Sequence, residues 1–131
     1  MNGWDPSALD LVSLLPRTAR GPRREGIYAL WLTLRVAQDL LLEPPIPERA
    51  HRRRVTALEA RLSSLTLPPP LRRGLTAALG QLKEAAPEQV PQVLSHLVAP
   101  ARDGAGAEAA EAVARAVKAA RAALEKGAAS P

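Results

Sequence analysis

The 131-residue chain carries a formal net charge of +5, has no cysteine, and has only two histidines, His51 and His96. Without cysteine neither a disulfide framework nor a thiolate metal site can form, and two distant histidines are a poor basis for a zinc site. The length is that of one domain large enough to bury about two-thirds of its unfolded surface. We therefore expect a single domain that folds without a metal or other cofactor.

The residue composition predicts an all-α fold. Alanine, leucine, arginine and glutamate are abundant, phenylalanine is absent, and no run alternates apolar and polar residues as a half-buried strand would. Most of the thirteen prolines fall where proline can begin a helix but cannot continue one. We expect a compact four-helix bundle, with helices near residues 22–42, 47–66, 69–86 and 87–99, flanked by an amphipathic N-terminal helix and an Ala-rich C-terminal helix.

Residues 1–16 are expected to form the short amphipathic helix. Asp5 can cap its start and Pro6 suits the first helical position. Apolar side chains then recur at helical spacing, at Leu9, Val12 and Leu15. A helix this short is marginal in water on its own, so it needs a surface to pack on.

Residues 17–26, RTARGPRREG, contain four arginines and no large apolar side chain, which is typical of a mobile basic tether. A tethered helix can pack on its own bundle or, with Trp4 as an anchor, enter a groove on a partner protein. Both alternatives are open from the sequence. For the second, the expected partner-binding residues are Trp4, Leu9, Val12 and Leu15.

The stretch from Ile27 to Leu42 is predicted to be the central helix. Large apolar side chains fall on nearly every side of its helical wheel, whereas a surface helix would show one apolar stripe. Other helices must therefore cover it on most sides. Arg35 and Asp39 are spaced i, i+4, where an exposed ion pair is expected. These charges, together with the short length, argue against a membrane span.

Residues 27–99 are the expected core of the bundle. One-sided apolar seams define its later helices: Val55, Leu58, Leu62 and Leu65 in the third, Leu71, Leu75, Leu79 and Leu82 in the fourth, and Val90, Leu94 and Leu97 in the fifth. Residues 100–106, PARDGAG, are predicted to be a loop by composition. Residues 107–127 form a helix of high propensity whose seam is mostly alanine, so little packing energy is expected to fix its position.

Arginine is concentrated between Arg17 and Arg73, where twelve arginines and no lysine stand against five acids. The third helix even begins with a basic first two turns, although acids are preferred near a helix N-terminus. Arginine binds phosphate in bidentate fashion and neutralises backbone charge. The candidate residues for an anion or nucleic-acid contact are Arg23, Arg24, Arg49, Arg52, Arg53, Arg54, Arg72 and Arg73.

No enzymatic activity and no small-molecule substrate are expected. Ser95 and His96 are adjacent and hence on different faces of a helix, and the sequence has neither a Gly-rich phosphate loop nor two histidines at metal-ligand spacing. The first apolar segment follows Asp5 rather than a basic region, so no secretory signal is expected and a cytoplasmic location is predicted.

The function expected is that of a non-catalytic adaptor or accessory subunit of a larger assembly. Its partner is another protein or a second copy of the chain, bound through the terminal helices and the arginine-rich surface. The alternative is an accessory protein that binds the nucleic-acid backbone. Against that alternative, the aromatic residues are not interleaved with the arginines and no helix-turn-helix or other reader motif is recognisable.

Overall fold

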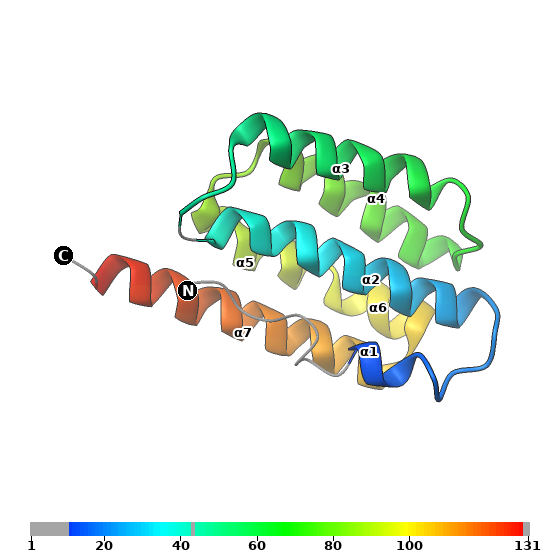
Figure 1. Cartoon of the computed structure of the whole chain (residues 1–131). Helices are drawn as coiled ribbons and strands as arrows, with labels where there is room; N and C mark the ends of the chain where they lie inside the picture. Colours follow the sequence, from blue (N-terminus) through cyan, green and yellow to red (C-terminus); the bar gives the residue numbers. More distant parts are fainter. Residues whose placement is uncertain (1–10, 43, 130–131) are drawn as a thin grey trace.

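The computed structural model describes residues 11–42 and 44–129, with side chains up to residue 126, and is shown in Figure 1. All regular structure in these residues is helical, as predicted. The helices are α1 (Leu11–Leu14), α2 (Pro22–Gln38), α3 (Glu48–Leu62), α4 (Pro69–Glu84), α5 (Val90–Ser95), α6 (Val98–Ala105) and α7 (Ala107–Ala129), with 3-10 turns η2 (Asp39–Leu41) and η3 (Pro87–Gln89).

Helix α2 is central, as its apolar surface predicts. It contacts α1, α3, α4, α6 and α7, and in Figure 1 it runs between the α3–α4 pair and α7. Ile27, Leu30 and Leu34 are completely buried along it. Trp31, which is also a large side chain of this helix, is only partly buried against the core. The remaining exposed part of α2 therefore carries an aromatic ring at the surface.

The predicted fourth helix of the bundle and the loop after it are both wrong. Residues 87–99 are divided into η3, α5 and the start of α6, and the expected loop at 100–106 is mostly α6. Pro100 is the third residue of α6 rather than a terminator, and a first-turn residue has no intrahelical N–H bond to lose. The four-helix bundle is therefore not confirmed, although the all-α class is.

Glycines allow α2, α4 and α6 to approach closely around Leu71. A Cβ added at Gly26 would lie 2.5 Å from Leu71 Cδ2, and one added at Gly104 would lie 2.7 Å from Leu71 Cβ. Gly74 of α4 likewise allows close contact with Pro100 of α6, whose ring carbons would be 2.7 Å from a Cβ added at Gly74. These contacts explain why glycine is tolerated inside helices where it lowers helix propensity.

Helix α7 is more firmly packed than its alanine seam suggests. It contacts α5 and α6 closely and also touches α1 and α2. Its buried side chains are Ala109, Ala110, Ala112, Val113, Ala116, Val117 and Ala120. Small side chains bring helix backbones close together, so α7 forms one wall of the core instead of an appendage.

None of the helices in the described ranges combines the length and the apolar character that crossing a membrane requires.

Candidate functional site

The N-terminal helix packs on the rest of the protein through a different face from the one that the sequence predicts. Of the expected partner-binding residues, Trp4 and Leu9 lie outside the described residues, Leu15 is partly buried, and Val12 is 36% exposed. The side chains that α1 buries are Leu11 and Leu14, at 0% and 5% exposure. Helix α1 contacts α2 and α7 of its own chain. Its buried face is therefore occupied within the protein.

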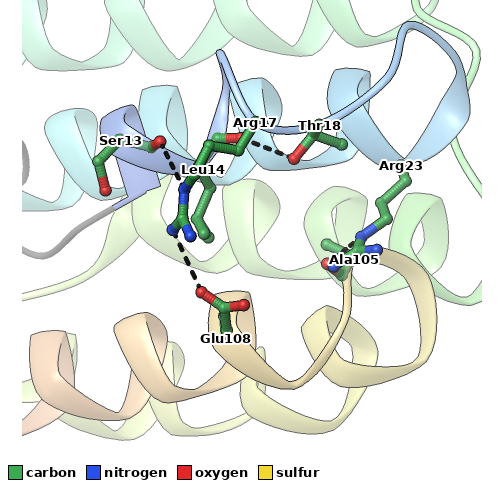
Figure 2. Close-up of polar contacts among 7 residues, drawn as sticks. All are labelled: Ser13, Leu14, Arg17, Thr18, Arg23, Ala105 and Glu108. Carbon is green, nitrogen blue, oxygen red and sulfur yellow. Dashed lines mark hydrogen bonds and ion pairs between the residues drawn. The ribbon is translucent and has the colours of Figure 1, made fainter.

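The segment expected to be a basic tether is anchored on both sides, as Figure 2 shows. Arg17 donates to the Ser13 carbonyl at 3.4 Å and pairs with Glu108 of α7 at 3.3 Å. Thr18 Oγ1 donates to the Leu14 carbonyl at 2.6 Å. Residues 22–26 already belong to α2, where Arg23 Nε donates to the Ala105 carbonyl at 3.0 Å. The contacts of Arg17 and Arg23 hold α1 and the start of α2 against the junction of α6 and α7.

The eight predicted anion-contact arginines do not form one surface. Four lie where α2 and α4 begin: Arg23, Arg24, Arg72 and Arg73. The other four lie in the first two turns of α3: Arg49, Arg52, Arg53 and Arg54. Figure 1 shows that the start of α3 is at the opposite end of the molecule from the starts of α2 and α4. The α3 arginines lie about 12 to 20 Å from the C-terminal end of that helix, at 1.5 Å per residue.

Several of these arginines have partners within the protein. Arg72 donates to the Leu62 and Leu65 carbonyls and so satisfies the C-terminal end of α3. Arg52 pairs with Glu84 of α4, and Arg54 pairs with Asp39 of η2. The basic start of α3 thus has a structural explanation, because acids on neighbouring elements balance two of its arginines.

A groove between α2 and α3, which the sequence reasoning missed, is the candidate site. Its volume is about 580 Å³. The apolar lining comes from Leu32, Val36, Leu42, Ile46, Ala57 and Leu58, and the polar lining from Tyr28, Arg35, Gln38, Asp39, Arg54 and Arg61. The groove therefore combines an apolar surface with three arginines and a single acid.

Two of the arginines beside the groove stack on aromatic rings. The guanidinium carbon of Arg61 lies 5.4 Å from the Tyr28 ring centroid, and that of Arg35 lies 5.2 Å from the Trp31 centroid. The two rings are 6.2 Å apart and tilted by 41°. Arg35 is therefore stacked on Trp31, and the exposed Arg35–Asp39 pair expected from their spacing is wrong. A guanidinium that stacks on a ring through its face keeps the N–H donors at its edge, which can bind an anion.

Asp39 is buried at the end of the groove, beside a buried histidine. Its Oδ1 accepts from Arg54 Nη1 at 2.6 Å, and its Oδ2 lies 3.9 Å from His51 Nδ1. On the other side of the ring, His51 Nε2 is 2.9 Å from the Leu82 carbonyl of α4. Asp39 and His51 are only 6% and 3% exposed. This polar group connects η2, α3 and α4.

The geometry favours the charged imidazolium. A carbonyl only accepts, so the Leu82 oxygen requires a proton on Nε2, and a neutral ring would then direct the Nδ1 lone pair at the Asp39 carboxylate. The pKa of His51 is accordingly raised above 6.5, chiefly by its interaction with Asp39 and against the opposing effect of burial.

We expect the free energy of unfolding to decrease as the pH rises through the His51 titration. A histidine whose folded pKa is raised stabilises the fold fully below its unfolded pKa, near 6.5, and loses that contribution as the pH passes the folded value. The thermal midpoint should be lower at about pH 9 than at about pH 6. In His51→Gln this difference should become smaller. If the thermal midpoint of His51→Gln falls between these two pH values as much as that of the parent, a group other than His51 causes the pH dependence of stability.

No protein family model, no curated protein and no solved structure matches this chain. Within the described part of the chain, no three histidine or carboxylate side chains are grouped as a metal site would need.

Proposed function

We propose that the protein is a non-catalytic adaptor or accessory subunit, and that the α2–α3 groove binds a segment of a partner protein. The observation that carries this proposal is the stacking of Arg61 on Tyr28 and of Arg35 on Trp31 beside an apolar groove. Tyrosine, tryptophan and arginine are the residues that contribute most often to the binding energy of protein interfaces. A cytoplasmic location, which the sequence predicts, is part of the same proposal.

The charge of the groove favours an acidic amphipathic helix as the bound segment. Arg35, Arg54 and Arg61 line it, and the one acid, Asp39, is already paired with Arg54. An amphipathic helix binds a groove through apolar side chains at i, i+3, i+4 and i+7. Such side chains would cover the exposed parts of Leu32 and Ala57, while flanking carboxylates meet Arg35 and Arg61.

This groove is a better candidate interface than the N-terminal helix or the dispersed arginines. The buried face of α1 is covered by its own chain, which leaves Val12 as its exposed apolar side chain. A nucleic-acid backbone would need a continuous basic stripe, whereas the predicted arginines lie at two ends and several are paired.

Arg61→Glu should weaken binding of an acidic helical peptide by about tenfold or more, because it replaces an attraction with a repulsion. The probe is a fluorescein-labelled synthetic peptide with leucines at helical spacing and glutamates on both flanks, and fluorescence anisotropy gives its Kd. Arg121→Glu is the matched control, since Arg121 is an exposed arginine on α7 away from the groove. Its Kd should equal that of the parent.

A second peptide with lysines in place of the glutamates should not bind. The proposal is wrong if the acidic peptide does not bind the parent, or if both charge-reversal variants weaken it equally. If the parent instead binds a nucleic-acid duplex of random sequence, and added salt weakens that binding steeply, the nucleic-acid alternative would be favoured.

A further inference from the structure

The Asp39 carboxylate is shared between a residue of the groove and a buried titratable group. Arg54, which contacts Oδ1, has a side chain that is 54% exposed and lines the groove. His51, which faces Oδ2, has a side chain that is 4% exposed and lies behind it. Any change in the charge of His51 therefore changes the electrostatic environment of a residue that is available to a ligand.

Only one of the two charge states of His51 helps to neutralise Asp39. In the neutral ring, with its proton on Nε2 toward Leu82, the Nδ1 atom offers the carboxylate no hydrogen. Arg54 is then the only cationic partner of Asp39 among the described residues. In the imidazolium, the positive ring, whose Nδ1 lies 3.9 Å from Oδ2, attracts the carboxylate and repels Arg54, so the net electrostatic attraction that holds Arg54 at Asp39 is weaker.

We propose that Arg54 is an anion-binding residue of the α2–α3 groove and that protonation of His51 makes it available by neutralising Asp39. The groove then binds an acidic segment more tightly as the pH falls. This inference rests on the proposed function for the identity of the ligand, but the coupling between His51, Asp39 and Arg54 is a property of the free protein. Because binding and protonation are thermodynamically linked, a bound acidic segment must in turn favour the protonated form of His51.

Of the other charged groups around His51, Arg54 opposes protonation of the ring, and most of the rest are paired with one another. Glu48 of α3 and Lys83 and Glu84 of α4 line a small hollow of about 150 Å³ together with His51 and Asp39. Lys83 is paired with Glu59, and Glu84 with Arg52. Glu48 has no ion pair with any side chain in the described ranges, and its negative charge also favours the imidazolium.

The coupling can be measured by NMR on the full chain without a ligand. We expect the Arg54 side-chain Nε–H signal to shift with the same midpoint as the His51 ring signals. Below that midpoint, the exchange rate at Arg54 divided by the intrinsic rate of a free arginine at the same pH should be higher. His51→Gln keeps a donor for the Leu82 carbonyl but does not titrate. In this variant the pH-dependent shift of the Arg54 Nε–H signal should be lost. An Arg54 signal that does not follow the His51 titration would overturn the inference.

The effect on binding is measured with the acidic peptide by anisotropy. Its Kd should increase by about fivefold between about pH 6 and pH 9, a range in which glutamate stays ionised. Arg54→Gln should bind weakly at both pH values and lose this dependence. Arg61→Gln is the matched control, and it should weaken binding while keeping the same ratio of Kd values.

The results separate the two proposals. If the Arg54 signal follows His51 but the peptide does not bind, the proposed function is wrong and the coupling stands. If the peptide binds equally well across the pH range, or if Arg54→Gln keeps the full dependence, the regulatory role of Arg54 is wrong while the groove remains a binding site. The Arg54 titration in the parent chain tests the coupling even if His51→Gln does not fold.

Discussion

Replacing Leu34 by alanine is expected to lower the free energy of unfolding by about 2 to 5 kcal/mol. Leu34 is 0% exposed on the central helix α2, which contacts five other helices. Truncation removes buried apolar surface, and it also leaves a cavity that surrounding helices can fill only partly. Since a domain of this kind has a total stability of about 5 to 15 kcal/mol, a large share of it would be lost.

Denaturant unfolding of the parent and the variant measures this change. Leu65→Ala is a suitable control, because Leu65 lies after the end of α3 and is only partly buried. The control should lose clearly less stability than Leu34→Ala. A Leu34→Ala midpoint equal to that of the parent would mean that α2 is not at the centre of the core.

The helices with strong apolar seams could be predicted from sequence, and α6 could not. Helices α2, α3 and α4 begin within a few residues of the prolines that mark their starts. In residues 98–105, Pro100 and Gly104 suggest a loop when only local propensity is considered. The structure shows that Gly104 is needed for close contact with Leu71, a residue far away in sequence. Tertiary packing therefore decides the helical state of this segment.

The candidate site depends even more on long-range contacts. The i, i+4 spacing predicted that Asp39 pairs with Arg35 on an exposed face. In the structure α2 ends at Gln38 and a 3-10 turn follows, and Asp39 is buried against Arg54 and His51 of α3. The pairing of Tyr28 with Arg61 likewise requires α3 to lie beside α2. The sequence shows that α2 contains Tyr28 and Arg35, but not that these residues lie beside α3.

The double substitution Leu11→Ala and Leu14→Ala is expected to lower the free energy of unfolding by about 2 to 5 kcal/mol in the isolated protein. Both side chains are buried, at 0% and 5% exposure, and they fix a helix of only four residues that is not stable alone. We expect α1 to detach from α2 and α7 as a unit in this variant. The loss is then limited to what the docking of α1 contributes, so the two changes should not be additive.

Val12→Ala is the matched control, since Val12 lies on the same helix and is 36% exposed. It should leave the thermal midpoint nearly unchanged. Amide exchange should be slower at the α1 residues of the parent and of Val12→Ala than in the double variant. If the double substitution left stability and amide protection unchanged, α1 would not be part of the isolated fold, and the prediction from sequence that this helix binds a partner protein would be favoured again.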